Sequence, residues 1–253
     1  MKNHKFYIVT LCYNCEEYIN DCLESIITQQ YDNYKVIIID DASSDGTVKR
    51  IKDFLNKHNH FNDRFNLIEN SERKGPLANH IQSLGVEEIK DNDIILHLDG
   101  DDLLTCSASL SIINKNYANN PKHLISYGNY ESATGKESIC KAWQSNISVS
   151  EYIAPIGWIF SHIRTFKYML WKHIDKKLSF YDEEGKIFTS AGDVAIMKPL
   201  LELAGRNRTM FFNKKMYYYR DNTSLNEHND HLHDQVRCAL QIASKPQYDL
   251  LND

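Results

Sequence analysis

The first hundred residues alternate between short apolar runs and segments with helical spacing. The apolar runs cover residues 6–11, 35–39, 65–68 and 93–98, and the helical patterns cover 18–27, 47–56 and 77–89. Strands separated by helices at this spacing predict a mostly parallel sheet built from β–α–β units. In such a sheet, ligands bind beyond the carboxyl ends of the strands. The acidic clusters of this half all lie at those ends, so we expect the site there.

After Leu104 the pattern is less regular. Helices are expected at 108–117, 165–173, 193–204 and 230–243, a strand at 124–127, and two short strands in 208–219 around the turn Asn213-Lys214-Lys215. The chain has no internal repeat or linker-like stretch. We therefore predict a single domain over 1–253, with a regular first part and a less regular second part.

Composition excludes several classes of partner. The chain of 253 residues has a formal net charge of −5, so no basic surface for nucleic acid is expected. An anionic ligand would need a local positive device such as a metal ion. No apolar run is long enough to span a bilayer, and no signal-like segment precedes the first strand. We expect a cytoplasmic protein without a membrane span; peripheral membrane contact and the oligomeric state stay open.

The strongest local signal is Asp99-Gly100-Asp101-Asp102, which follows an apolar strand. Three carboxylates in four residues repel one another unless protons or a cation neutralise them. Oxygen ligands of this kind suit Mg²⁺ or Mn²⁺. The alternative is a solvated acidic turn, because Asp and Gly are ordinary turn residues.

A second acidic cluster, Asp40-Asp41-Ala42-Ser43-Ser44-Asp45-Gly46-Thr47, follows the second strand. Its simplest interpretation is a loop that caps the next helix through Ser44 or Asp45. A carboxylate of the same loop can also accept a hydrogen bond from a base such as uracil. Different residues serve the two roles, so both interpretations can hold.

These two clusters, together with Tyr13-Asn14-Cys15-Glu16 and Gly75-Pro76-Leu77-Ala78-Asn79, occur in an order that resembles the family 2 glycosyltransferases. The resemblance covers residues 6–104 well and the rest more thinly. It implies the GT-A fold, a Rossmann-like, mostly parallel sheet flanked by helices with a less regular acceptor-side half. It also implies a nucleotide-sugar-binding half at 1–104, an acceptor and catalytic half at 105–225, and a C-terminal helical segment at 226–253.

The same resemblance implies roles for individual residues. Asp41 would accept from uracil, Asp99 would lie near the ribose and the metal, and Asp101 would bind the metal directly. The implied cofactor is Mn²⁺ or Mg²⁺, and the implied donor is a UDP-sugar. The residues expected at the donor site are Leu11, Tyr13, Glu16, Asp41, Gly75, Asn79, Asp99 and Gly100.

In the second half, Ala191-Gly192-Asp193-Val194 resembles the family's Glu-Asp motif, with Gly192 in place of Glu. By resemblance Asp193 is the general base that deprotonates an acceptor hydroxyl, and the reaction inverts the anomeric configuration. The acceptor is expected to be a glycan or a similar hydroxyl compound. The alternative for Asp193 is a helix-start acid stabilised by the helix dipole.

Two further segments carry open alternatives. Trp158 would stack on a sugar face or belong to the core. Asn222 stands where the family usually has a metal- or phosphate-binding His. Either Asn222 binds phosphate directly, or a nearby histidine substitutes, or the role is absent. The candidate histidines are His228, His231 and His233, for which a solvated polar face is the alternative.

Rival functions come from other classes. Asp99-Gly100-Asp101 after a strand is also typical of haloacid-dehalogenase-type phosphatases, although Leu103 replaces the expected Thr or Val. A nicotinamide dehydrogenase is disfavoured because no GxGxxG follows the first strand. A non-catalytic sugar-nucleotide-binding module would need the donor-site acids but not Asp193.

Overall fold

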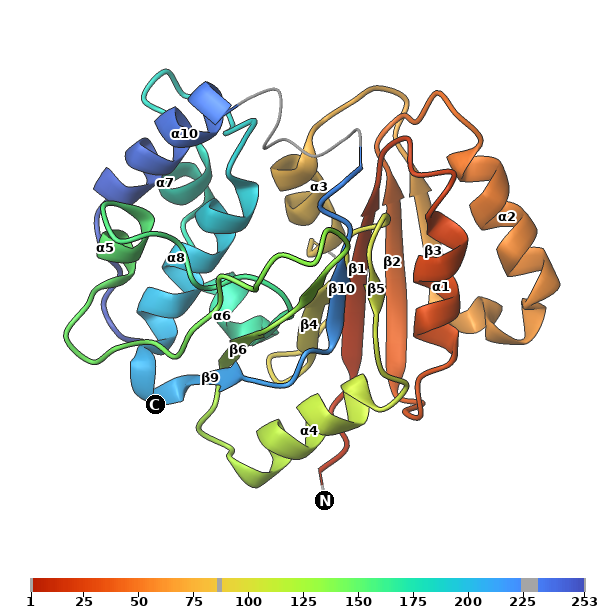
Figure 1. Cartoon of the computed structure of the whole chain (residues 1–253), viewed down its shortest axis with the longest axis horizontal. Coiled ribbons are helices and arrows are strands. Elements are labelled where there is room, and N and C mark those ends of the chain that lie inside the picture. The colour runs from red at the N-terminus through yellow and green to blue at the C-terminus, as the bar shows by residue number, and fades with distance from the viewer. Residues whose placement is uncertain (1, 86–87, 224–231, 253) are drawn as a thin grey trace.

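A computed structural model describes residues 2–85, 88–223 and 232–252 of the chain. Its centre is a twisted seven-stranded sheet, seen nearly edge-on in Figure 1. The strand order is β3 (Phe65–Glu69), β2 (Tyr34–Asp40), β1 (Phe6–Cys12), β4 (Ile94–His97), β8 (Arg164–Lys167), β6 (Ile125–Gly128) and β9 (Thr209–Phe212). The predicted α/β class is confirmed.

Strand direction divides the sheet. β3, β2, β1 and β4 run parallel to one another, whereas β8 runs antiparallel to both β4 and β6. β6 and β9 are again parallel. The first half is therefore the regular β–α–β part, and its strands end at one edge where their loops meet.

A second, three-stranded sheet links distant segments. It contains β5 (Leu103–Leu104), β10 (Tyr217–Tyr219) and β7 (Glu131–Ser132). β10 pairs antiparallel with β5, the strand that directly follows the acidic loop 99–102. This pairing places the 217–223 segment beside the acidic loop.

Helices cover both faces of the large sheet (Figure 1). One face is covered by α1 (Ile19–Ile27), α2 (Thr47–Lys57) and α4 (Ser109–Asn119). The other face is covered by α3 (Pro76–Ser83), α5 (Val149–Ile153), α6 (Tyr168–Lys172), α7 (Lys176–Phe180), α8 (Gly192–Ala204) and α10 (Leu232–Ser244). Two 3₁₀ turns, η1 (Asn59–Arg64) and η2 (Arg206–Arg208), precede β3 and β9.

Alternation along β1 explains the two apolar layers. Phe6 and Ile8 pack into the α1 side, whereas Tyr7 and Val9 pack into the α3 side. A strand buried on both faces has no polar side, which is why these segments read as continuous apolar runs.

Three expected elements differ in the structure. The helix predicted at 165–173 begins only at Tyr168, because Arg164–Lys167 forms strand β8 and all four of its residues are buried between β4 and β6. The helix predicted to run to residue 89 ends at Ser83. The two strands around Asn213 do not pair with each other, since β9 joins the large sheet and β10 the small one.

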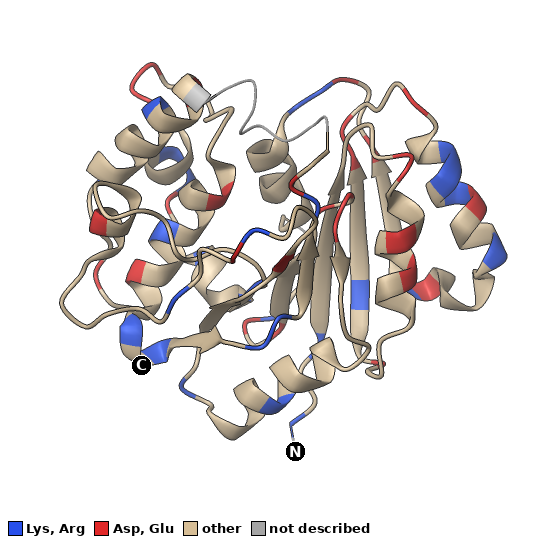
Figure 2. Ribbon diagram, in the orientation of Figure 1, with Lys and Arg blue, Asp and Glu red and all other residues tan. Residues whose placement is uncertain are grey.

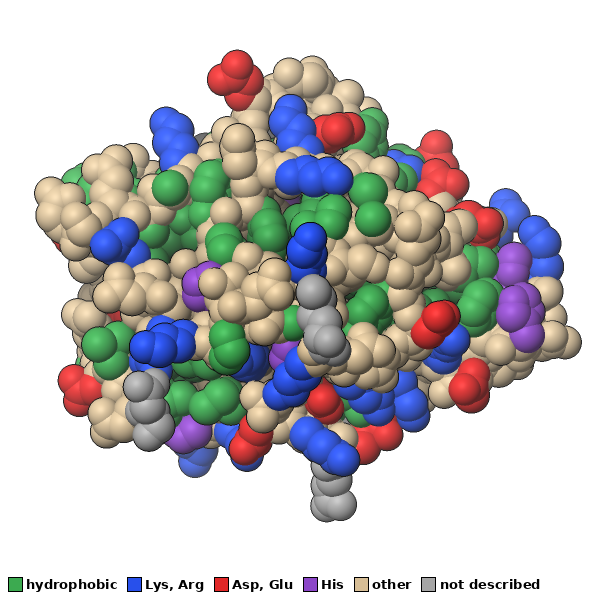
Figure 3. Space-filling model, turned by 90° about the horizontal axis from the view of Figure 1, so that it is seen from below, with side chains coloured by type: hydrophobic (Ala, Val, Ile, Leu, Met, Phe, Trp, Pro, Cys, Tyr) green, Lys and Arg blue, Asp and Glu red, His purple; other side chains and the backbone are tan. Residues whose placement is uncertain are grey.

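Two surface properties complete the description. Among the described residues, none of the helices has the length and apolar character needed to cross a membrane. Basic and acidic side chains are interspersed on the face seen from below (Figure 3), so this face shows no field of a single sign.

Candidate functional site

The candidate site is a cavity of about 540 Å³ at the carboxyl ends of the first-half strands, between the α3 and α8 sides. Figure 2 shows acidic segments at these strand ends. Of the ten residues expected at the donor, metal and catalytic positions, seven line this cavity, namely Leu11, Tyr13, Asp41, Asn79, Asp99, Asp101 and Asp193. The expected donor-side and acceptor-side residues therefore face one space.

Asp41 is held in place before any ligand arrives. Its carboxylate accepts backbone hydrogen bonds from Lys74 (2.8 Å) and Gly75 (2.8 Å) and a side-chain bond from Asn70 (3.0 Å). Burial raises the pKa of Asp41, but these bonds and the Asn79 amide outweigh burial and lower it below its usual value. Gly75 thus contributes through its backbone and does not itself line the cavity.

Glu16 and Gly100 do not line the cavity but shape the loops beside it. The Glu16 carboxylate accepts from the Gly46 backbone N–H at 2.8 Å, beside the start of α2, and pairs with Arg50. A Cβ on Gly100 would lie 2.7 Å from the Cys12 Sγ and 2.9 Å from the Leu11 carbonyl. The acidic loop can approach the end of β1 this closely only with glycine at that position.

Tyr13 has a partner that the sequence did not reveal. The guanidinium of Arg73 lies 3.8 Å from the centroid of the Tyr13 ring, and both side chains line the cavity. This is a cation–π contact. One face of the ring is therefore occupied by a cation.

The acidic loop is fixed by β10 and the residues after it. Asp102 accepts from the Tyr217 hydroxyl (2.7 Å) and from the Arg220 backbone N–H (2.7 Å). Arg220 also donates to the Asp101 carbonyl at 2.5 Å and to Asp21 at 2.8 Å. Burial and the neighbouring acids raise the pKa of Asp102 well above its usual value. Burial and Asp99 raise the pKa of Asp101 to about 6.

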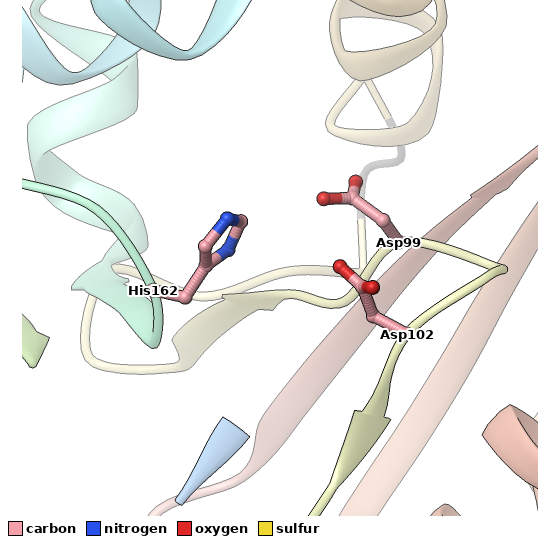
Figure 4. A group of neighbouring side chains, drawn as sticks. All are labelled: Asp99, Asp102 and His162. Atoms are coloured by element: carbon pink, nitrogen blue, oxygen red, sulfur yellow. The ribbon is translucent and has the colours of Figure 1, made fainter. Parts of the chain in front are cut away.

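Asp99, Asp102 and His162 converge on one point (Figure 4). One ligand atom from each lies within 4.8 Å of the others. The His162 ring is stacked on Tyr217 (4.3 Å between centroids) and on Tyr219 (5.0 Å), and its buried Nδ1 has no hydrogen-bond partner among the described residues. Burial and Arg164 lower the pKa of His162, so the imidazole is neutral and can ligate a cation.

Asp193 lies in the first turn of α8, after Ala191 in the left-handed backbone conformation (φ 55°). Its carboxylate is 3.5 Å from Nη1 of Arg164, and Nη2 of the same guanidinium is 3.3 Å from Asp99. Burial lowers the pKa of Arg164, but Asp99 and Asp193 outweigh burial and raise it.

The other second-half candidates divide. Trp158 lines the cavity and contacts Phe160 edge-on (5.1 Å between centroids), so it combines a site position with a core contact. Asn222 and His233 are exposed and do not line the cavity. His228 and His231 lie outside the described residues.

Comparison with known sequences decides the family. The sequence model described as glycosyl transferase family 2 matches residues 7–184, which is more than half of the chain. The chain belongs to glycosyl transferase family 2. This match does not favour the phosphatase alternative.

A curated relative agrees with this assignment of the family 2 chain. The putative glycosyltransferase EpsE of Bacillus subtilis is 38% identical over 101 residues, covering 39% of this chain and 34% of that protein. The family 2 chain spans less than half the length of the curated relatives it matches.

Solved structures place the family 2 chain in the GT-A fold. TarS of S. aureus in complex with UDP-GlcNAc has a TM-score of 0.66 and 19% identity, covering 97% of this chain and 68% of that one. Glucosyl-3-phosphoglycerate synthase of Mycobacterium tuberculosis, in complex with Mn²⁺, UDP and phosphoglyceric acid, has a TM-score of 0.62 and 14% identity, covering 96% and 80%. The expected fold is confirmed.

Proposed function

We propose that this family 2 chain is a metal-dependent, inverting glycosyltransferase that moves a sugar from a UDP-sugar to a hydroxyl of a glycan-type acceptor. One observation carries the proposal. The donor-side acids Asp99 and Asp101 and the base candidate Asp193 face the same cavity, and a single guanidinium contacts both Asp99 and Asp193. A donor sugar lying between these groups would have Asp99 and Asp101 near its diphosphate leaving group and Asp193 near the attacking acceptor hydroxyl.

Nucleotide recognition is assigned to the 1–104 half. A carboxylate offers about four acceptor positions, and three of those on Asp41 are occupied by protein donors. The remaining position suits one ring N–H, as uracil presents. Tyr13, Arg73 and Asn79 also line the cavity and supply an aromatic face, a cation and an amide. The TarS structures with UDP and UDP-GlcNAc support a uridine donor.

The residues present fit a divalent cation. The donor set offers carboxylates from the acidic loop and a neutral imidazole from His162, whose buried Nδ1 has no partner in the described structure. Oxygen donors with one imidazole favour Mn²⁺ over Mg²⁺. Asp101 is not part of the Asp99, Asp102 and His162 group. Asp102 already accepts from Tyr217 and Arg220, however, so we assign it to positioning and propose direct binding by Asp99 and Asp101. His162 would stand in for the family His that Asn222 replaces.

The transfer step follows from these positions. The acceptor oxygen attacks the anomeric carbon, the bond from that carbon to the diphosphate oxygen breaks, and the acceptor proton passes to the Asp193 carboxylate. When bound, the metal ion would neutralise the negative charge that develops on the diphosphate. Attack opposite to the leaving group inverts the anomeric configuration.

The acceptor side is assigned to 105–225 together with the C-terminal segment 226–253. Trp158, Phe188 and Met197 line the cavity, as do Val236 and Ala239 from α10. Apolar and aromatic surfaces of this kind stack against sugar faces and exclude water.

The test is a screen of UDP-, GDP- and dTDP-sugars for transfer and slow hydrolysis, with Mn²⁺, Mg²⁺ or EDTA. We expect turnover with a UDP-sugar only when the metal is present, and an inverted anomer by NMR. Asp193→Asn should bind the donor normally but turn over at least about a hundredfold more slowly. Full activity in excess EDTA would refute metal dependence. Donor binding without turnover by the unaltered chain would favour the non-catalytic binding module instead.

A further inference from the structure

Arg164 is a buried cation between two acids from opposite sides of the cavity. It lies on β8 opposite His97 of β4, and only 6% of its surface is exposed. Nη2 is 3.3 Å from the Asp99 carboxylate, and Nη1 is 3.5 Å from the Asp193 carboxylate. Neither the acidic-loop motif 99–102 nor the 191–194 motif contains this residue, which lies one position before the helix predicted at 165–173.

No other described cation competes with Arg164 for Asp99 or Asp193. Within residues 2–85, 88–223 and 232–252, it is the one Lys or Arg side chain that forms an ion pair with Asp99 or with Asp193. Burial lowers the pKa of the nearby His80 to about 3, and burial, His80 and Arg164 lower that of His97, so both imidazoles are neutral. The charge on the guanidinium is therefore directed at the two acids.

Asp193 needs such an anchor. Its side chain is 34% exposed and lies in the first turn of a helix, where an unrestrained carboxylate turns toward water. The guanidinium is planar, carries its N–H donors in a fixed fork, and does not lose its proton in proteins. A fork with one arm on Asp99 and the other on Asp193 sets the separation of the two carboxylates.

We propose that Arg164 is a positioning residue that fixes the base Asp193 relative to the donor-side acid Asp99. The inference rests on the proposed function, because it takes Asp193 as the base. Arg164 transfers no proton itself. It keeps the Asp193 carboxylate aimed into the cavity, where the acceptor hydroxyl must lie when its oxygen attacks. A lysine ammonium is a single point and cannot span both acids.

The test compares Arg164→Met, Asp193→Asn and the double variant by kcat, KM and donor affinity. Misplacing a reacting group by about 1 Å costs about a hundredfold in rate, so Arg164→Met should lower kcat by that order. Affinity for UDP with Mn²⁺, measured by calorimetry, should change by less than about threefold. The variant loses an interaction that positions the base in the transition state and keeps those that bind the donor in the ground state. In the double variant, the loss should be close to that of Asp193→Asn alone.

The matched control is Lys167→Met. Lys167 is another buried cation on β8, but it donates to the Pro121 carbonyl and does not line the cavity. The Lys167→Met variant should lower thermal stability without changing kcat. Its fold-change in kcat, close to one, should multiply with that of Asp193→Asn in the double variant. Arg164→Lys should stay close to Arg164→Met, whereas added methylguanidinium should restore part of the rate of Arg164→Ala.

The outcomes separate the two proposals. If Asp193→Asn keeps the unaltered rate, the base assignment fails. If Asp193→Asn is inactive but the Arg164 and Asp193 losses multiply, or Arg164→Lys is fully active, the positioning role is overturned while the base assignment stands. If Arg164→Met does not fold, by circular dichroism, Arg164→Lys and the methylguanidinium rescue decide the question.

Discussion

The hydroxyl of Tyr217 donates a 2.7 Å hydrogen bond to the Asp102 carboxylate, across 115 positions of sequence. The same hydroxyl accepts from the Asp99 backbone N–H at 3.2 Å. One side chain of β10 therefore holds both the first and the last acid of the acidic loop. The shape of the loop is set by a strand that folds against it from the far end of the chain.

Tyr217→Phe tests this support. The change removes one donor from a buried carboxylate whose pKa is already raised, so Asp102 loses part of its stabilisation. We expect a loss of about 1–3 kcal/mol in the free energy of unfolding. Mn²⁺ affinity should fall as well, because the loop is less well ordered. The comparison variant is Tyr218→Phe, because the Tyr218 hydroxyl forms no hydrogen bond with the residues that the structure describes. Equal losses in both variants would contradict the assigned role.

Asp101→Asn should raise the thermal stability of the metal-free protein above pH 6. The pKa of Asp101 is raised from 3.8 to about 6, so between these values the folded state holds a proton that the unfolded state has released. Stability therefore falls as pH rises through this window and stays lower above it. Asparagine does not ionise. The melting temperature of the Asp101→Asn variant in EDTA should therefore exceed that of the unaltered protein at pH 7.5 but not at pH 4. A difference that is the same at both values would refute this linkage.

Asp41→Asn should weaken UDP binding almost as much as Asp41→Ala. The carboxylate faces the backbone N–H groups of Lys74 and Gly75 with different oxygens. An amide places its NH₂ against one of these donors in either orientation, so one bond becomes a repulsion. Calorimetry with UDP and Mn²⁺ measures the change. Near-normal UDP affinity in the asparagine variant would show that Asp41 is not the acceptor of the uracil N–H.

Gly100→Ala should destabilise the fold and disturb the acidic loop. Its Cβ would meet the Cys12 sulfur at 2.7 Å and the Leu11 carbonyl at 2.9 Å, closer than real Cβ contacts allow. Forced overpacking of this kind costs about 1–3 kcal/mol. Gly85→Ala is the control, because the nearest atoms to its Cβ lie at 3.5 Å. Urea denaturation of both variants measures the difference, and equal midpoints would contradict the close approach.

The first-half fold was predictable because its signals are local. β1, β2 and β4 are short apolar runs that end in polar motifs, and parallel topology brings those ends to one edge. β8 was mispredicted because its residues run on into α6, and the apolar spacing of the combined segment looks helical. Pairing with the flanking strands β4 and β6 decides its conformation, and that pairing cannot be predicted from the local sequence of the segment.

The site follows the same division. Asp41, Asp99, Asp101 and Asp193 stand in motifs, and all four line the cavity. The partners that hold or complete these acids lie far away in sequence, as Arg164 lies 65 positions from Asp99. Buried contacts between distant segments depend on tertiary packing, so residue type and spacing alone do not indicate them. The sequence predicted no individual role for these partners, which are Arg73, His162, Arg164 and Tyr217.

Arg220 joins three parts of the chain at once. Its backbone N–H binds Asp102, and its guanidinium binds the Asp101 carbonyl and the Asp21 side chain of α1. The acidic loop cannot separate from Arg220, the residue after β10, without breaking the bonds to Asp101 and Asp102, so the loop and the β10 segment open to solvent as one cooperative unit. If the loop binds a cation as proposed, the rate at which that cation escapes would be governed by the opening of a strand that lies outside residues 7–184. Sequence changes in that strand would then set how long such a cation stays bound, while leaving β1 and β2 untouched.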